Sequence, residues 1–213
     1  KNGNVNLGFD STDGSVCAYS VGGGSYTPLA DCTSPKTITL ADGRNSIVLK
    51  VTDVAGNFKE SDAVSFVVDT NNNLTVGATS ADFATIQEAV TKATAGDTIS
   101  VAAGTYAEPI QTLAACNEPA SLCIDKPLTL RGEPGDAVAG PGLNAPVLNG
   151  TGLGNGSAIA LLRGNAISNV TIEGFVIRNY TNPVWQGGVG SGVIAWNTAA
   201  SNIIVRDNSF ENL

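Results

Sequence analysis

The chain has 213 residues, of which 42% are hydrophobic and 14% are charged, and its formal net charge is −8. This acidic balance excludes the basic footprint that nucleic acids and anionic membranes require, so neither is an expected partner. No apolar run reaches the length of a membrane span and no signal peptide is visible, while the apolar content is ample for one large core or two smaller ones.

Short runs of Val, Ile and Thr separated by glycine predict an all-β chain. In the first third, such runs alternate with turns rich in Gly, Asp and Asn, which favour reversals at positive φ. Ile47, Leu49 and Val51 form an alternating apolar face, and this pattern indicates a two-sheet sandwich. The runs expected to form its strands are residues 5–9, 16–19, 37–40, 46–53 and 64–68.

Four cysteines stand in two local pairs, Cys17 with Cys32 and Cys116 with Cys123. Zinc sites usually combine cysteine with histidine at shorter spacings, and the sequence has no histidine. We therefore predict two disulfides, in preference to metal ligation or free thiols, and an extracellular or cell-surface location. Asn-x-Ser/Thr sequences point weakly to the same compartment, at Asn73, Asn149, Asn155, Asn169 and Asn179.

Four segments of this first third resemble a bacterial immunoglobulin-like repeat. They are the cysteine-bounded, glycine-rich residues 17–34, LADGRN at 40–45, VTDVAGN at 51–57 and FVVDT at 66–70. The resemblance implies an immunoglobulin-like sandwich over residues 1–70. Repeats of that family have a further N-terminal strand, for which only three residues precede Asn4, so we expect the sandwich to lack its first strand.

Residues 71–78 are expected to form a polar, Asn-rich linker, and the spacing of apolar residues changes after it. Residues 83–94 predict a short amphipathic helix, since their apolar positions recur at helical spacing. Ser80 or Asp82 can cap its start, and Gly96 marks its end. The apolar side chains that share one face of this helix are Phe83, Ile86 and Val90.

Residues 80–132 resemble the N-terminal end of pectate-lyase-like right-handed β-helix proteins. The segments that carry the resemblance are FATIQEAV at 83–90, AGDTI at 95–99, AGTY at 103–106 and KPLTLRG at 126–132. In that family a helix caps the open end of the first coil, and brief strands wind around a narrow apolar core. The resemblance implies a right-handed parallel β-helix with a short N-terminal capping helix over residues 79–213. Strands expected at 98–101, 127–130 and 146–148, each followed closely by glycine, suit such coils.

The last third of the sequence repeats at a spacing of 33 residues, the separation of Asn169 from Asn202. Repeats of this length suit a solenoid whose coils bury each other's faces. Opposite charges and asparagines would then stack about 4.8 Å apart and fix the register of the coils. The expected pairs are Glu173 with Arg206, Arg178 with Glu211, Asn169 with Asn202 and Asn179 with Asn212. We also expect further coils after Leu213.

Three aromatic side chains are candidates for contact with a sugar, namely Tyr180, Trp185 and Trp196. Trp185 stands in a polar, glycine-rich stretch that we expect to project from the solenoid. Trp196 aligns with Leu162 in the repeat, so lateral packing is the alternative interpretation of its ring.

The sequence predicts no catalytic residue and no metal site. Polysaccharide lyases of the resembling family set a basic residue beside calcium-holding carboxylates, and glycoside hydrolysis needs two carboxyls a few Å apart. The carboxylates and arginines of the repeat are instead expected to pair in its ladder. The absence of histidine excludes imidazole catalysis within this chain. Calcium is the one candidate ion, with exposed turn carboxylates as the preferred interpretation of Asp10, Asp13, Asp53 and Asp69.

Together these features predict an extracellular structural or adhesive surface protein, as part of a surface layer or filament, rather than an enzyme. Its expected partners are copies of itself, other surface proteins or a polysaccharide. The alternative is a polysaccharide lyase or glycoside hydrolase whose active coils lie beyond Leu213. The surface protein predicts stacked ladders and contacts between chains, whereas the enzyme predicts a groove lined by carboxylates and a basic residue.

Overall fold

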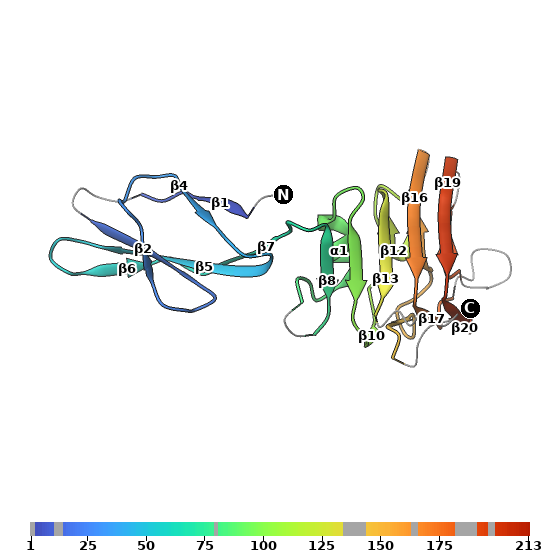
Figure 1. The fold of residues 1–213 in the computed structure, drawn as a ribbon. Helices are drawn as coiled ribbons and strands as arrows, with labels where there is room; N and C mark the ends of the chain where they lie inside the picture. The colour runs from blue at the N-terminus through green and yellow to red at the C-terminus, as the bar shows by residue number, and fades with distance from the viewer. Residues whose placement is uncertain are drawn as a thin grey trace. The chain divides into compact units, whose positions relative to one another are not determined.

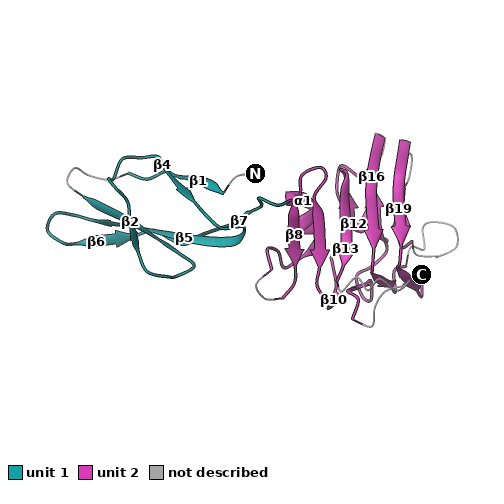
Figure 2. Ribbon diagram, in the orientation of Figure 1, with its two compact units in different colours: residues 1–71 teal, residues 72–213 magenta. Residues whose placement is uncertain are grey.

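The computed structural model describes residues 3–10, 15–78, 81–133, 144–162, 166–181, 191–195 and 199–213. The chain divides into two compact units, residues 1–71 and 72–213, which Figure 2 colours separately. Both units consist of strands, and α1 (Ile86–Lys92) is the single helix of the described residues (Figure 1). The fold class is therefore all-β, as the sequence predicts. No helix in the described part of the chain is long and apolar enough to cross a membrane.

The described part of unit 1 forms two antiparallel sheets. The smaller sheet pairs β1 (Asn4–Leu7) with β4 (Lys36–Thr39). The larger sheet is built around a long central strand that pairs with β2 along one edge and with β6 and β7 along the other. Its strands are β2 (Val16–Val21), β3 (Thr27–Pro28), β5 (Gly43–Thr52), β6 (Phe58–Glu60) and β7 (Val64–Val68).

A small apolar core lies between these two sheets. Strands of both layers contribute to it, and its buried members are Leu7, Ile38, Leu40, Ile47 and Val68. The predicted apolar face of β5 is only partly covered, because Ile47 is 4% exposed whereas Leu49 and Val51 are half-buried. The smaller sheet has two strands against five in the described residues, so it cannot cover the whole inner face of the larger one.

The sequence missed two short strands of unit 1, β3 and β6. Each follows a turn and contributes two or three residues, too few for an alternating pattern to stand out. The turn that leads into β6 is the VTDVAGN segment. There the Asp53 carboxylate accepts hydrogen bonds from the backbone N–H groups of Ala55 and Asn57, at 2.9 and 2.8 Å. This Asp-centred turn closes the hairpin of β5 and β6.

The residues expected to form a linker, 71–78, contain strand β8 (Asn73–Val76). This strand pairs in parallel with β9 (Thr98–Val101) and thus belongs to unit 2. Leu74 and Val76 are 2% and 1% exposed, whereas Asn73 is exposed and Thr75 is half-buried. Four residues of alternation among asparagines are hard to distinguish from a polar linker, which is why the sequence did not indicate a strand here.

Helix α1 is shorter than predicted and has a different cap. Thr85 is its N-cap, and the Thr85 side chain accepts a hydrogen bond from a backbone N–H of the first turn. The expected cap Asp82 instead accepts hydrogen bonds from the backbone N–H and hydroxyl of Thr75, at 2.8 and 2.9 Å. Ser80, the other expected cap, lies outside the described residues. Because its carboxylate is engaged by β8, Asp82 does not cap the helix, and the N-cap lies three residues later at Thr85.

The described strands of unit 2 form three sheets, in which every pair is parallel except β11 with β12. Sheet I contains β8, β9, β13 (Leu128–Gly132), β16 (Ala166–Glu173) and β19 (Ala199–Arg206). Sheet II contains β10 (Thr105–Tyr106), β14 (Val147–Asn149), β17 (Val176–Arg178) and β20 (Ser209–Glu211). Sheet III contains β11 (Gln111–Thr112), β12 (Pro119–Ile124), β15 (Ser157–Leu161) and β18 (Val193–Ile194).

The chain visits these sheets in a fixed order, and we call one passage through sheets I, II and III a coil. The first complete coil runs β9, β10, β12, and the next two run β13, β14, β15 and β16, β17, β18. Strands of successive coils therefore stack side by side, as Figure 1 shows for β13, β16 and β19. Inward side chains stack as well, since Ile99, Leu130 and Ile172 are in register and each is 0% exposed.

Backbone from adjacent coils approaches very closely where sheet I ends. A Cβ atom on Gly132 would collide with the Gly174 carbonyl and with the ring of Pro146. Gly174 itself has a φ of 81°, in the left-handed region that favours glycine. The glycine that ends the KPLTLRG segment is thus required by the contact between coils.

Candidate functional site

A ladder of charged side chains crosses the outer face of sheet I. Glu173 lies opposite Arg131 on one neighbouring strand and opposite Arg206 on the other. Arg131 Nε donates a hydrogen bond to Glu173 Oε1 at 2.6 Å, and Arg206 Nε donates to Oε2 at 2.7 Å. A single carboxylate therefore links β13, β16 and β19, which belong to three successive coils.

The environment of Glu173 favours its ionised form. The residue is 8% exposed, and this desolvation acts to raise the pKa of its carboxyl. The hydrogen bonds and positive charges of Arg131 and Arg206 outweigh desolvation, so that the pKa is lowered overall. With both oxygens engaged by guanidinium groups, this carboxylate is placed to hold strands together rather than to transfer protons.

The second expected charge pair is in register but does not form an ion pair. Arg178 lies opposite Glu211 on sheet II, as the repeat predicts. Within the described residues, however, no ion pair joins these two side chains, and Glu211 accepts a hydrogen bond from Ser209 at 3.3 Å. Arg178 Nε is buried and has no hydrogen-bond partner in the part of the chain that the structure describes. The two side chains thus lie on paired residues of neighbouring strands, and Glu211 is engaged by Ser209 instead.

Asparagine side chains form two further ladders between coils. Asn202 Nδ2 donates to Asn169 Oδ1 at 2.6 Å. On the other ladder, Asn179 Nδ2 donates to Asn149 Oδ1 at 2.9 Å, and Asn212 Nδ2 donates to Asn179 Oδ1 at 3.4 Å. All of these asparagines except Asn149 have φ between 50° and 60°, a left-handed backbone that asparagine tolerates better than most residues. The ladders therefore sit where the chain turns.

Both predicted disulfides are present, and the four cysteines leave none free. Cys17 and Cys32 join strand β2 to the loop before β4 within unit 1. Cys116 and Cys123 close a short loop against sheet III. Around this second disulfide a small apolar cluster includes Ala120 and Ala160, which are 2% and 0% exposed. The loop thus covers this part of sheet III.

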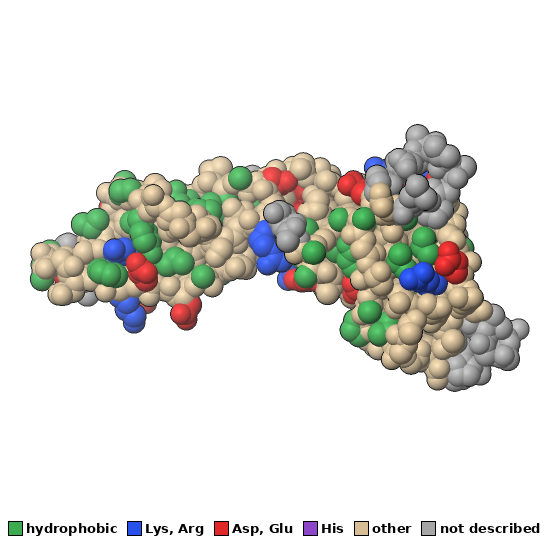
Figure 3. Space-filling model, turned by 90° about the horizontal axis from the view of Figure 1, so that it is seen from below, with side chains coloured by type: hydrophobic (Ala, Val, Ile, Leu, Met, Phe, Trp, Pro, Cys, Tyr) green, Lys and Arg blue, Asp and Glu red, His purple; other side chains and the backbone are tan. Residues whose placement is uncertain are grey.

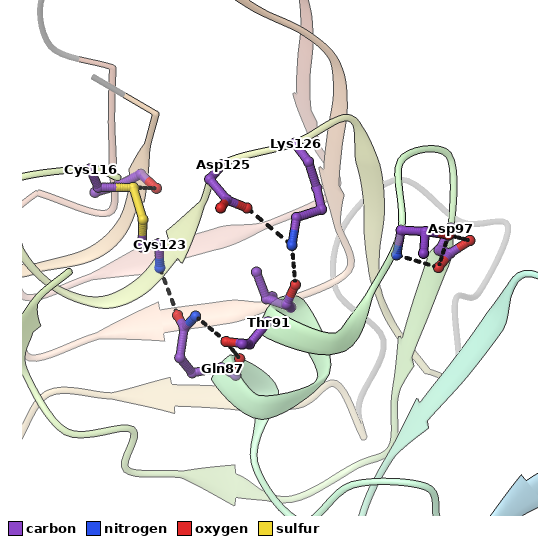
Figure 4. A network of polar contacts seen from close by, with 10 residues as sticks. Gln87, Thr91, Asp97, Cys116, Cys123, Asp125 and Lys126 are labelled. Atoms are coloured by element: carbon purple, nitrogen blue, oxygen red, sulfur yellow. Dashed lines mark hydrogen bonds and ion pairs between the residues drawn. A yellow bond between two sulfur atoms is a disulfide. The ribbon is translucent and has the colours of Figure 1, made fainter. Parts of the chain in front are cut away.

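Helix α1 is fastened to the same region by polar contacts, shown in Figure 4. The Gln87 side chain accepts a hydrogen bond from Cys123 N at 2.7 Å and donates one to Thr91 Oγ1 at 3.2 Å. Lys126 Nζ donates to the Val90 carbonyl at 2.9 Å, near the C-terminal end of the helix, where a positive charge is favourable. Together with the buried Ile86 and Val90, these contacts hold α1 against unit 2.

One carboxyl group beneath the helix is buried, although the sequence gave no reason to single it out. Glu108 is 4% exposed, and its Oε1 accepts a hydrogen bond from Ile86 N at 2.7 Å. Desolvation raises the pKa of this carboxyl, against the opposing effect of backbone hydrogen bonds from Ile86 and Gln87. The Glu108 carbonyl accepts from Ser121 Oγ, which in turn accepts from Tyr180 Oη at 3.2 Å.

The aromatic candidates for sugar contact do not form a surface platform in the described residues. Tyr180 is 1% exposed and lies in the interior of unit 2, so its ring is not available to a ligand. Its position next to the positive-φ corner at Asn179 turns it inward, which a pattern of polar neighbours could not reveal. Trp185 and Trp196 lie outside the described residues.

Among the described residues, the candidate calcium carboxylates do not form a cluster of metal ligands. No group of three or more potential metal-ligating side chains occurs among residues 3–10, 15–78 and the rest of the described chain. Asp53 is engaged in its turn, where hydrogen bonds from the Asn57 side chain and backbone lower its pKa. Asp13 lies outside the described residues. The residues that line an open groove of about 900 Å³ beside the β5–β6 hairpin include Asp10, Asp53, Leu49 and Val51.

The surface in Figure 3 carries no large zone of one charge. Lys and Arg lie close to Asp and Glu, and hydrophobic side chains are interspersed with polar ones. Such a mixed surface fits the absence of basic patches in the sequence.

Comparison with known proteins finds a similarity in unit 1 only. A family model described as bacterial Ig-like domain matches residues 18–70. The match spans the second cysteine, the VTDVAGN turn and the closing strand β7, which are the segments on which the resemblance rested. No curated protein and no solved structure matches the chain. A bacterial Ig-like domain is consistent with a surface or structural protein, and the resemblance of unit 2 to pectate-lyase-like proteins stays a prediction.

Proposed function

We propose that this chain is an extracellular structural or adhesive surface protein, in which an immunoglobulin-like sandwich and a right-handed parallel β-helix serve as rigid modules of a surface layer or filament. The observation that carries the proposal is the Arg131–Glu173–Arg206 ladder. The ionisable groups of sheet I that a polysaccharide enzyme would need for catalysis are engaged in holding successive coils together.

The order of the strands supports a β-helix for unit 2. Sheets I, II and III are visited in turn by consecutive coils, and each coil adds one parallel strand to each sheet. Crossovers between parallel strands are right-handed in about 98% of cases, because a right-twisted strand packs back onto its sheet most easily in that sense. Such a solenoid transmits force along its axis through every backbone hydrogen bond between coils, which suits a structural module.

An extracellular location is supported by the two disulfides and the Ig-like match. Both disulfides link cysteines that are close in sequence, with separations of 15 and 7 residues, so each can form locally in an oxidising compartment. Cys116 and Cys123 are 0% and 6% exposed, so reductants reach this disulfide poorly in the folded protein.

Labelling of intact source cells tests the location. A membrane-impermeant amine reagent applied before lysis should modify exposed lysines such as Lys59, while a cytoplasmic marker protein stays unlabelled. Protein that becomes labelled only after the cells are opened would contradict the proposal.

The enzyme alternative is tested with the purified protein. Incubation with a panel of neutral and acidic polysaccharides, with and without calcium, should produce no new reducing ends and no unsaturated products. Cleavage of any member that disappears in a Glu173→Gln variant would overturn the structural assignment of this ladder.

A further inference from the structure

The five Asn-x-Ser/Thr sequences of the chain differ sharply in their surroundings. Three of these asparagines, Asn149, Asn169 and Asn179, belong to the ladders between coils. Neighbouring coils are separated by one strand spacing of about 4.8 Å, so each of these side-chain amides is engaged by an asparagine of the next coil, although Asn169 itself is exposed. A glycan attached there would also remove an N–H from Asn179, which donates to Asn149.

The fourth sequence, at Asn73, is part of sheet I. Asn73 Oδ1 accepts a hydrogen bond from Ser100 Oγ at 3.1 Å on the neighbouring strand. The hydroxyl of Thr75, which completes the acceptor sequence, donates to Asp82 at 2.9 Å. The side chains of Asn73 and Thr75, the two residues that define this acceptor sequence, are therefore both engaged in hydrogen bonds within the fold.

The fifth sequence, at Asn155, has a different setting. Asn155 is exposed and follows a turn in which Gly152 and Gly154 have φ of 74° and 94°. Its backbone is anchored, because the next residue, Gly156, donates a hydrogen bond from its N–H to the Thr181 carbonyl at 2.8 Å. Its side chain makes no hydrogen bond within the described residues. An exposed amide on an anchored surface turn is the setting in which an acceptor sequence can carry a glycan.

We propose that Asn155 is an N-glycan attachment site, an inference that rests on the extracellular location proposed above. The co-reactant is an oligosaccharide linked to a lipid through pyrophosphate. The Asn155 amide nitrogen forms a bond to C1 of the first sugar, the bond from C1 to the pyrophosphate oxygen breaks, and the lipid pyrophosphate departs. The amide nitrogen loses one proton to a base of the transferase.

The structure also indicates when the transfer takes place. Ser157, whose hydroxyl completes the acceptor sequence, is 2% exposed at the start of β15. A transferase must reach this hydroxyl, so the transfer precedes the closure of this coil. After closure the Asn155 side chain stays outside, and the glycan is accommodated without loss of a hydrogen bond between coils.

Peptide mass spectrometry of the protein purified from its source cells tests this proposal. The peptide that contains Asn155 should carry a glycan, and enzymatic removal of the glycan should convert the residue to Asp. A glycan on Asn149, Asn169 or Asn179 would disturb a ladder between coils, so in the folded protein the peptides of these residues should be unmodified. Unmodified Asn155 in protein that is labelled at the cell surface would overturn the glycan site and leave the proposed function standing. Protein that is neither labelled nor modified would contradict both.

A matched set of variants separates the acceptor sequence from the fold. Asn155→Gln and Ser157→Ala should each remove the mass of one glycan, whereas Ser157→Thr keeps an acceptor sequence and should retain it. Ser157→Ala adds no bulk to the buried site, so thermal unfolding should confirm that this variant folds. Retention of the modification in folded Ser157→Ala would show that the modification is not an N-glycan and would overturn the proposal.

Discussion

Units 1 and 2 are both β-structures, yet they bury their cores to different extents. In the apolar cluster between the two sheets of unit 1, every buried residue keeps some exposure, from 4% for Ile47 to 8% for Leu7. In unit 2 the stacked residues Ile99, Leu130 and Ile172 are all 0% exposed. A stacked coil is covered by a neighbour on each side, whereas the two-strand sheet of unit 1 leaves part of its partner open. Stacking buries short strands more completely than two-layer packing does.

Removal of a stacked core side chain should have the largest effect. Leu130→Ala should destabilise unit 2 by about 2–5 kcal/mol, because its neighbours in the adjacent coils cannot close the cavity. Leu49→Ala, at a half-buried position of unit 1, should cost only about 1 kcal/mol. Urea unfolding followed by hydrogen exchange of each unit measures both changes. Equal losses in the two variants would contradict the difference in burial.

Loss of a disulfide should affect the smaller core more seriously. Replacement of Cys17 and Cys32 by alanine opens a 15-residue separation and should cost unit 1 about 3 kcal/mol. The corresponding change at Cys116 and Cys123 removes a link between cysteines 7 residues apart and should lower the stability of unit 2 by about 2 kcal/mol. We expect unit 2, with its more completely buried core, to have the larger free energy of unfolding. Thermal unfolding should therefore show unit 1 lost first. The comparison would be reversed if unit 1 without its disulfide unfolds at a higher temperature than unit 2 without its own.

The charge ladder should make a smaller, pH-dependent contribution to unit 2. Glu173→Gln should lower stability at pH 7 by about 1–2 kcal/mol, because Arg131 and Arg206 are partly exposed and water screens their charges. The folded-state pKa of Glu173 is lowered, so its stabilisation is present above the ordinary glutamate value and is lost as pH falls through the folded-state value. Glu211→Gln, which breaks no ion pair within the described residues, is the control and should change stability little.

Glu108 should give the smallest effect, with the opposite dependence on pH. Its folded-state pKa is raised, so its contribution is fully present below the ordinary glutamate value and is lost as pH rises through the folded-state value. The stability of the wild type should therefore gain a decline as the pH rises from acid values, and this part of the decline should be absent from Glu108→Gln. Denaturant midpoints measured across pH 4–8 compare the variant with the wild type. If the denaturant midpoint of the wild type rises across this range while that of the variant stays constant, the predicted direction of the Glu108 contribution is wrong.

Much of the fold follows from local patterns. The cysteine pairs, the turns and the 33-residue register of Asn169 with Asn202 are visible in the sequence, because each depends on residue type at short or constant spacing. Arg131 was missed because it is 42 residues from Glu173, a spacing that the longer connection between β13 and β14 displaces from the repeat. Asn149 was missed because it lies 30 residues from Asn179 rather than 33, which is outside the constant spacing of the repeat.

Other contacts depend on folding itself. Glu108 becomes buried because α1 folds over it, and the sequence between them has no regular spacing. Tyr180 points inward because the backbone turns at Asn179, although its polar neighbours favoured exposure. Sequence patterns predicted the strands and their order better than the direction of individual side chains, since that direction is set by backbone turns and by neighbours distant in the chain.

The most direct test of the account is a high-resolution structure of the native assembly on or from the surface of the source cells. The account predicts that the chain lies within an extracellular layer or filament, contacts neighbouring subunits, and keeps Glu173 between Arg131 and Arg206. Isolated chains with a sugar bound in a groove lined by carboxylates and a basic residue would contradict it and establish a polysaccharide enzyme.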